Sequence, residues 1–254
     1  MALIVSVINN KGGTGKTTTV HNLGAALTKK KKRVLLIDMD SQCNLTSALG
    51  LSTKEPNLST LLLGKCAIED VIHRDGLLAG IPSCEKVLET ESVISNEPGR
   101  EYILKEQLEK VKNDFDFILI DCPPSLGILS VNSLVAADYF IVPMQAENFA
   151  FIGLDRIMLI TEKVQKRMNP GLKLAGILFV KLVPRTKFSQ AVITQLSENE
   201  HLANKLFETF IRQDIALMES GAFNKSVFDF APGSRGADDY KDFANEFLSK
   251  YGKK

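Results

Sequence analysis

The stretch Asn9-Asn10-Lys11-Gly12-Gly13-Thr14-Gly15-Lys16-Thr17-Thr18 decides the fold of this 254-residue chain. It follows a short apolar run, residues 3–8, and precedes a segment, residues 16–31, with apolar side chains at helical spacing. Glycines allow the loop to curl so that successive backbone N–H groups face inward, and the positive end of the following helix adds to the attraction for anions. The context of strand, loop and helix predicts a phosphate-binding loop.

Two other interpretations of the stretch fit less well. A simple glycine-rich turn does not require the sequence Gly15-Lys16-Thr17-Thr18, and a dinucleotide loop would need glycine rather than threonine at position 18. In a phosphate loop, Lys16 reaches the β and γ phosphates and the Thr17 hydroxyl binds Mg²⁺. The usual first glycine is replaced by Asn10, and a second lysine, Lys11, stands at the start of the loop. Lys11 is either a solvated loop residue or a cation that meets phosphate oxygens of its own or of a facing subunit.

The rest of the chain alternates between buried strands and helices, which predicts an α/β fold with a doubly wound, mostly parallel sheet flanked by helices, as in P-loop NTPases. Residues 51–100 are harder to interpret, but they favour short helices at 58–63 and 68–72, an extra strand at 77–81 and a loop at 92–99. No linker or repeat interrupts the pattern, so residues 1–254 are expected to form a single domain. The expected strands are residues 3–8, 33–38, 115–121, 139–143 and 174–180, and the expected helices are residues 16–31, 101–112, 125–136 and 151–168.

Composition excludes several classes of protein. Lys and Arg number 31 and Asp and Glu number 30, so the chain is not a polycation, and nucleic-acid binding would require a local basic patch. The 4 cysteines contain no CxxC pair, which favours free thiols over a zinc site or a disulfide framework. No apolar run approaches the roughly 20 residues that span a bilayer, and the first residues do not resemble a secretory leader, so a cytoplasmic protein is expected.

Three carboxylates follow predicted strands. Asp38 and Asp40 come at the end of the second strand and Asp121 ends the third. The carboxyl ends of parallel strands form the edge where ligands bind in open α/β sheets. A charge at the end of an apolar strand is costly unless it is paired, and Mg²⁺ would compensate Asp121. The alternative is that these residues cap helices or are ordinary surface acids.

Several segments together resemble one known family. The loop Lys11–Thr18 resembles the deviant Walker A motif of the ParA/MinD superfamily, residues 35–46 resemble its second motif, and residues 117–127 resemble its Walker B segment. The stretch 227–240 resembles the C-terminal region of the ParA/Soj branch. The resemblance covers nearly the whole chain in order, and it implies an ATPase with ATP and Mg²⁺ as ligands and slow basal turnover.

The resemblance also assigns residues. The implied catalytic residues are Lys11, Lys16 and Asp40, with Asp40 positioning the attacking water. Thr17, Asp121 and Asp38 are the expected metal residues, with Asp38 in a supporting role. Contacts with adenine are expected near Arg212 and Asp214, although Ile211-Arg212-Gln213-Asp214 differs from the Ile-Pro-Arg-Asn of many relatives. The remaining nucleotide contacts are expected from the loop itself: Lys11, Gly12, Gly13, Thr14, Gly15, Lys16, Thr17 and Thr18.

The expected biological role is partition of a plasmid or chromosome. Two subunits would enclose two ATP molecules, with each Lys11 crossing to the other subunit, and hydrolysis would release this homodimer. The dimer would bind DNA without sequence preference, lie on the nucleoid, and be stimulated by a ParB-type centromere-binding protein. The basic run 29–33 is interpreted as a solvated helix end, with DNA contact as the alternative. Candidate DNA contacts are Lys181, Arg185, Lys187, Arg212, Lys225 and Arg235.

Two alternatives remain open. The first is a membrane-positioning ATPase like MinD, or another cargo-positioning relative. Apolar residues from Ala237 to Tyr251 form a helical stripe, but acidic residues beside it favour packing against a core over a membrane surface, so no stable membrane insertion is expected. The second is a metabolic relative, either an ATP-using ligase or an iron–sulfur reductase, although cluster cysteines and a dedicated substrate pocket are not evident.

Overall fold

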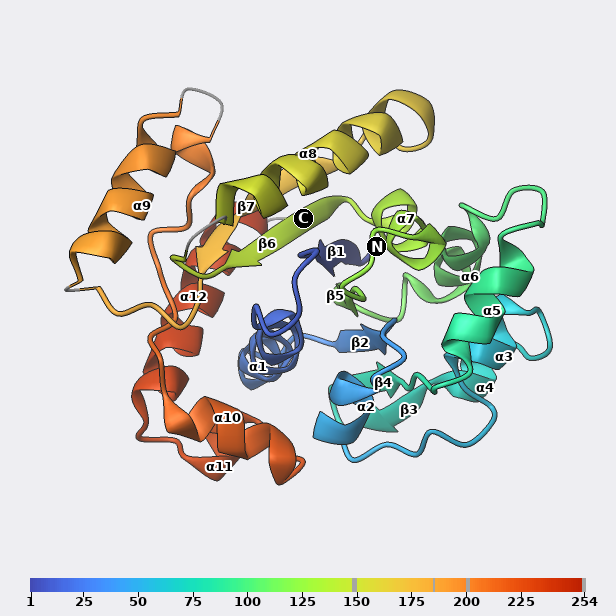
Figure 1. Ribbon diagram of the computed structural model, residues 1–254. Coiled ribbons are helices and arrows are strands. Elements are labelled where there is room, and N and C mark those ends of the chain that lie inside the picture. The colour runs from blue at the N-terminus through green and yellow to red at the C-terminus, as the bar shows by residue number, and fades with distance from the viewer. Residues whose placement is uncertain (148–149, 185, 200–201, 253–254) are drawn as a thin grey trace.

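The computed structural model describes residues 1–147, 150–184, 186–199 and 202–252, and its strands form one seven-stranded sheet with helices on both faces (Figure 1). The strand order is β3-β4-β2-β5-β1-β6-β7. Neighbouring strands are parallel except for β3, which pairs antiparallel with β4. The strands are β1 (Leu3–Val7), β2 (Val34–Asp38), β3 (His73–Asp75), β4 (Leu78–Ile81), β5 (Phe117–Asp121), β6 (Tyr139–Met144) and β7 (Lys173–Phe179).

The central strands are buried on both faces, as their continuous apolar sequences predict. Alternate side chains of β1 enter two separate cores, with Ile4 in one and Val5 and Val7 in the other. Helices α3 to α8 cover the first core. The second core lies under α1 and α12, where Tyr240, Phe243 and Phe247 are fully or almost fully buried.

The helices fill the connections between strands, as a doubly wound sheet requires. A 3₁₀ turn, Ala203–Lys205, follows α9. The helices are α1 (Lys16–Lys29), α2 (Asn44–Ala48), α3 (Leu58–Leu62), α4 (Ile68–Val71), α5 (Val87–Ile94), α6 (Ile103–Val111), α7 (Ile128–Ala136), α8 (Ala150–Arg167), α9 (Lys187–Ser197), α10 (Ile215–Ala222), α11 (Val227–Phe230) and α12 (Arg235–Tyr251).

The expected fold class is confirmed, and most expected elements are present with shifts of a few residues. The loop expected at 92–99 is wrong at its start, because α5 continues to Ile94, whose side chain is buried against the first core. The sequence patterns also missed β3, whose three residues are exposed and charged or polar, and therefore lack the apolar signature of a buried strand.

Candidate functional site

The phosphate loop lies at the carboxyl edge of the sheet, directly after the central strand β1. Strands β5 and β6 pair with opposite sides of β1. The loop after β1 therefore lies at the crevice where ligands bind in open α/β sheets. A cavity of about 590 Å³ opens here, which is large enough for a nucleotide. It is lined by residues 12–18, Asp40, Gln42, Lys181, residues 211–214, Met218 and residues 220–222, among others.

The loop has the backbone that its glycines predict. Gly13 and Gly15 have φ values of +74° and +76°, a region that side chains with a Cβ rarely adopt. A Cβ on Gly15 would also lie 3.4 Å from the side chain of Val180, just beyond the end of β7. Helix α1 begins at Lys16, so its first N–H groups face the loop.

Lys16 is drawn into the protein. Its side chain is almost fully buried, and its Nζ donates to the backbone oxygen of Lys11 at 3.2 Å. Burial lowers the pKa of Lys16, while the nearby carboxylate of Asp121 opposes this change. A buried ammonium beside a concave ring of backbone donors is suited to hold anionic oxygens.

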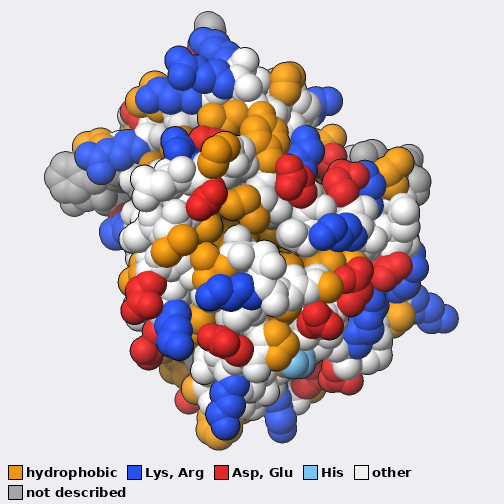
Figure 2. Space-filling view, turned by 90° about the vertical axis from the view of Figure 1, so that its right-hand side faces the viewer, with side chains coloured by type: hydrophobic (Ala, Val, Ile, Leu, Met, Phe, Trp, Pro, Cys, Tyr) orange, Lys and Arg blue, Asp and Glu red, His pale blue; other side chains and the backbone are white. Residues whose placement is uncertain are grey.

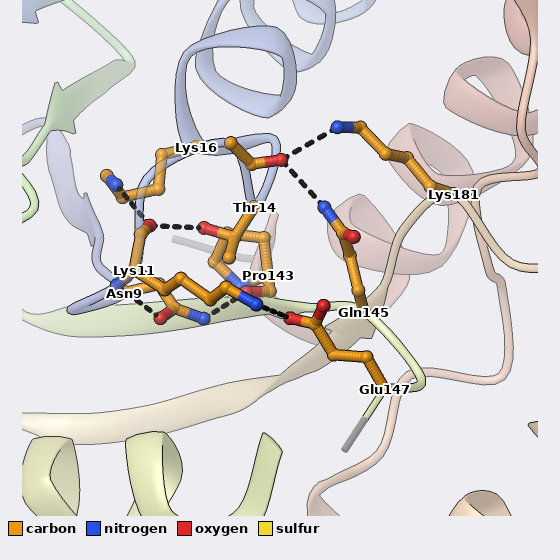
Figure 3. Close-up of polar contacts among 9 residues, drawn as sticks. Asn9, Lys11, Thr14, Lys16, Pro143, Gln145, Glu147 and Lys181 are labelled. Atoms are coloured by element: carbon orange, nitrogen blue, oxygen red, sulfur yellow. Dashed lines mark hydrogen bonds and ion pairs between the residues drawn. The ribbon is translucent and has the colours of Figure 1, made fainter. Parts of the chain in front are cut away.

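Side chains that follow β1, β6 and β7 support the loop through hydrogen bonds (Figure 3). Asn9 accepts from the Lys11 backbone N–H at 3.0 Å and donates to the Pro143 oxygen at 2.7 Å. The Gly13 oxygen accepts from the Gln145 amide at 2.7 Å and from the Lys181 ammonium at 2.8 Å. No local sequence pattern pointed to Gln145. Lys181, which was expected as a DNA contact, lines the cavity, and its contact with DNA stays a prediction.

The second lysine of the loop, Lys11, forms an ion pair. Lys11 Nζ donates to Oε1 of Glu147 at 2.6 Å, and the two side chains are 59% and 32% exposed (Figure 3). An ion pair with this exposure is weak, so Lys11 can exchange its partner at little cost. The role of Lys11 toward a facing subunit stays a prediction.

The end of β2 holds a fully buried carboxylate with protein partners. Asp38 accepts from the Asp40 N–H at 3.0 Å, and from the Thr46 N–H and hydroxyl at 2.8 and 2.7 Å. Burial raises the pKa of Asp38 to about 6, although these hydrogen bonds oppose the shift. Asp38 therefore ties the strand end to α2, and its expected supporting role at a metal stays a prediction.

The neighbouring strand β5 ends in a second buried carboxylate, Asp121, which differs from Asp38 in its hydrogen bonding. Asp121 pairs in register with Asp38, yet neither of its buried oxygens makes a hydrogen bond of ordinary geometry with the described residues. Burial raises the pKa of Asp121 well above its usual range and Asp38 adds to the rise, whereas the nearby Thr17 hydroxyl and Lys16 ammonium oppose it.

These unpartnered oxygens test whether the site fits a metal ion. Mg²⁺ prefers oxygen ligands and commonly takes one or two protein groups together with phosphates and water. Asp121 and Thr17 provide such groups, so the residues fit Mg²⁺. Among the described residues no cluster of three or more His, Cys, Asp or Glu side chains is arranged to hold a metal by itself.

Asp40 lies between the loop and α2. Its side chain is 9% exposed, lines the cavity, and accepts from the Gln42 N–H at 3.1 Å. The carboxylate is thus held by a local turn and faces the same space as Lys16. This placement is compatible with the predicted task of orienting water, which stays a prediction.

The two expected adenine residues line the cavity, but their side chains have internal partners. Arg212 makes a forked contact with Asp239, with Nη2 at 2.6 Å and Nε at 3.0 Å from Oδ1. Asp214 accepts from the N–H groups of Ala216 and Gly236, at 3.0 and 2.7 Å, and so joins α10 to α12. Their contact with a base stays a prediction.

The remaining DNA candidates are spread over the surface. Lys187, Lys225 and Arg235 are exposed, and Arg185 lies outside the described residues. The guanidinium of Arg212 is engaged by Asp239, so it is a weaker candidate. Positive and negative side chains are interspersed across the middle of the face in Figure 2, which carries no continuous basic surface there.

Two other expectations concern helix ends. Helix α1 ends at Lys29, which pairs with Asp229 at 3.0 Å, and Arg33 pairs with Asp116 at 3.0 Å. Two members of the basic run are therefore paired with acids, and the choice between a solvated helix end and DNA contact stays a prediction. The apolar stripe of α12 packs into the second core, as predicted. Within the described residues, no helix combines the length and apolar character needed to cross a bilayer.

Comparison with known proteins agrees with this geometry. The AAA domain model matches residues 2–174. The sporulation initiation inhibitor protein Soj of Bacillus subtilis is 37% identical, covering 97% of this chain and 98% of the relative. The chromosome-partitioning ATPase Soj of Treponema pallidum is 36% identical and covers 97% of each chain. One similar solved structure is a crystal structure of a Mycobacterium smegmatis protein named cobyrinic acid a,c-diamide synthase, with a bound ATP analogue and magnesium. Its sequence is 34% identical, its TM-score is 0.82, and the match covers 100% of this chain and 98% of that one.

Fold, loop and carboxylates are those of a P-loop ATPase. The similarity to the Soj proteins extends over almost the full length of both chains, beyond the segment that the domain model covers. The chain belongs to the ParA/Soj family of the ParA/MinD superfamily.

Proposed function

We propose that this protein is an ATP-dependent partition switch that hydrolyses ATP slowly, pairs with a second copy when ATP is bound, and then binds DNA without sequence preference. The observation that carries the proposal is the meeting of the loop lysine Lys16, the cavity-lining Asp40 and the unpartnered Asp121 at one sheet edge. Similarity to the Soj proteins supports the same conclusion.

The residues divide the work of phosphoryl transfer. Lys16 and the loop N–H groups hold the phosphates, and Asp40 orients the attacking water. Thr17 and Asp121 would hold Mg²⁺, with Asp38 beside them. When bound, the ion neutralises charge on the β and γ phosphates. Little covalent chemistry is required of the protein, because positioning and charge neutralisation supply most of the catalysis.

Lys11 gives the switch its link to a second subunit. In the single chain its ammonium lies on Glu147 and is more than half exposed. On pairing, Lys11 would leave Glu147 and bind phosphate oxygens of the facing subunit. A charge-assisted contact with phosphate is stronger than an exposed ion pair, so the exchange favours the ATP-bound pair.

Light scattering with the Asp40→Ala variant tests this function. With ATP and Mg²⁺ the variant should form a stable dimer without hydrolysing ATP, and with ADP it should be monomeric. Lys16→Ala, which removes the phosphate-binding ammonium, should bind no nucleotide and is the matched negative control. A variant that stays monomeric with ATP would contradict the switch.

DNA binding needs a separate measurement. Duplexes of unrelated sequence should be retained with ATP and not with ADP, and retention should weaken steeply as salt rises. The exposed residues Lys187, Lys225 and Arg235 are the described candidates for phosphate contacts. A ParB-type centromere-binding protein is the proposed stimulating partner. Sequence-specific retention, or retention that is independent of nucleotide, would contradict the proposal.

The name of the Mycobacterium smegmatis relative favours a second candidate, an ATP-dependent amide synthase. A synthase activates a carboxylic acid at the expense of ATP, so phosphate release depends on the acid substrate. A partition ATPase releases phosphate without it. Phosphate release from the purified protein with Mg²⁺ and DNA alone, compared with release after addition of cobyrinic acid and an amide nitrogen donor, separates the two.

A membrane-positioning role has less support. The side chains that would enter a lipid surface, Tyr240, Phe243 and Phe247, are buried against α1 and the sheet. Co-sedimentation with anionic vesicles in the presence of ATP should therefore fail.

A further inference from the structure

A carbonyl oxygen on the phosphate loop is held by two donors that come from different strands. Gln145 follows β6 and Lys181 follows β7, and they are 132 and 168 residues from Gly13 along the chain. Both side-chain donors converge on the Gly13 oxygen, at 2.7 and 2.8 Å (Figure 3). We infer that Gln145 and Lys181 form a clamp on the Gly13 oxygen that positions the loop for nucleotide phosphates.

The covalent geometry of the peptide explains how the clamp acts. In a planar trans peptide the C=O and the following N–H point in opposite directions. Fixing the Gly13 oxygen on the side of β6 and β7 therefore directs the Thr14 N–H the other way and restricts rotation of this peptide. Gly13 has a positive φ and no side chain to limit its rotation, so an external restraint has a large effect here.

Electrostatics adds to the geometry. A charged donor on a carbonyl polarises the peptide and makes its N–H a stronger donor. Lys181 also lines the nucleotide cavity, so its positive charge strengthens the field that attracts phosphates. The backbone of Lys181 has a φ of +51°, which is uncommon for a residue with a Cβ and indicates that the surrounding structure holds it in place.

The remaining contacts make the clamp part of a rigid support. Asn9 fixes the start of the loop to Pro143 of β6, and Val180 packs against Gly15. The loop is thus anchored before and after Gly13 as well as at Gly13 itself. Gln145 and Lys181 are positioning residues, because their hydrogen bonds are made with the backbone of the loop.

This inference rests on the proposed function, so its test uses ADP with Mg²⁺, which is held by the loop without requiring a second subunit. Dissociation constants are measured for Gln145→Met, Lys181→Met and the double variant. Gln145→Met removes a donor without changing charge, and we expect about threefold weaker binding. Lys181→Met also removes a charge, and about tenfold is expected.

The coupling between the two variants is decisive. Because either donor alone still restrains the Gly13 oxygen, the double variant should lose about 100-fold, more than the product of the single effects. Lys181→Arg, which keeps a charged donor, should remain within about threefold of the unaltered chain. Lys163→Met, at an exposed position of α8, controls for net charge and should bind ADP normally. The thermal midpoints of the nucleotide-free variants should match that of the unaltered chain.

Three results would overturn the clamp. One is a double variant equal to the product of the single effects, and another is a Gln145→Met variant with unchanged affinity beside a weakened Lys181→Met. The third is a lowered thermal midpoint that accounts for the lost binding, which would make the role one of stability. Failure of the unaltered chain to bind ADP would instead overturn the proposed function, and the clamp with it.

Discussion

The ends of β2 and β5 lie side by side and differ in how they treat a buried acid. Asp38 and Asp121 pair in register and are both almost completely buried. Three donors surround Asp38, whereas the oxygens of Asp121 have no protein hydrogen bond of ordinary geometry among the described residues. The protein itself supplies hydrogen-bond donors to Asp38, whereas the carboxylate of Asp121 is available to a bound ligand such as a metal ion.

This difference separates residues that maintain a site from residues that act in it. Hydrogen-bonded buried acids stabilise the surrounding structure, while an unpartnered ionised one costs free energy that a bound cation recovers. Arg212 and Asp214, the residues expected to contact adenine, belong with the residues that maintain the site, because their side chains make internal contacts with α12.

Removing the charge at the end of β5 should have a greater effect on activity than any other change proposed for these two strand ends. Asp121→Asn should lower Mg²⁺-dependent ATP hydrolysis by about 1000-fold, because the site loses the charge that a magnesium ion compensates. Phosphate release at saturating ATP and a range of Mg²⁺ concentrations measures this. Asp75→Asn, the same change at an exposed position of β3, should leave hydrolysis unchanged. Comparable loss in both variants would refute a special role for Asp121.

The next effect breaks the β2 side. Asp38→Ala should lower the free energy of unfolding by about 3 kcal/mol, because the N–H groups of Asp40 and Thr46 and the Thr46 hydroxyl lose their acceptor. Urea denaturation without nucleotide gives the value. Thr46→Val, which removes one of these donors, should lose less. A loss under about 1 kcal/mol for Asp38→Ala would show that water replaces the lost contacts.

A buried histidine outside the sheet edge, His21, makes the stability of the protein depend on pH. Burial in α1 lowers the pKa of His21 to about 4, and Asp229 opposes this only in part. As pH falls below about 6.5, His21 becomes protonated in the unfolded chain but stays neutral in the folded chain, so the free energy of unfolding decreases until pH reaches about 4. Between pH 6.5 and 4.5 this decrease is about 2 to 3 kcal/mol.

His21→Gln isolates that contribution. Denaturation of both proteins at several pH values should give a shallower pH dependence for the variant, since all other titrating groups are shared. Parallel curves for the two proteins would mean that the pKa of His21 is the same in the folded and unfolded chains.

The smallest effect returns to Asp121 in the absence of ligands. Because its buried carboxylate makes no hydrogen bond of ordinary geometry with the described residues, Asp121→Asn should raise the free energy of unfolding by about 1 to 2 kcal/mol when nucleotide and Mg²⁺ are absent. A variant that is more stable and less active would confirm that stability is given up for function at this position. Equal or lower stability would indicate that the protein already satisfies Asp121 by itself.

Local patterns allowed the core of this molecule to be predicted. The apolar runs that became β1, β2 and β5, and the glycines and lysine between β1 and α1, are signals contained within a few neighbouring residues. The ordering of these elements then placed Asp38 and Asp121 at one edge, because parallel strands end on the same side.

The rest depended on contacts between distant parts of the chain. The partners of the Gly13 oxygen are more than a hundred residues away along the chain, and Arg212, which precedes α10, pairs with Asp239 of α12. No local pattern marks such pairs, so the contact of Lys181 with the loop was not predicted from the sequence. Nor can the lack of partners around Asp121 be seen before the surroundings of the strand are known.

The short antiparallel strand β3 has a consequence for how copies of the chain can meet. It ends the sheet with His73, Arg74 and Asp75, all exposed, and Arg74 is held across the ring of Phe115 and by Asp114. A brief, charged border of this kind resists the addition of a strand from another molecule. Growth into fibrils by extension of the sheet is therefore discouraged at this border.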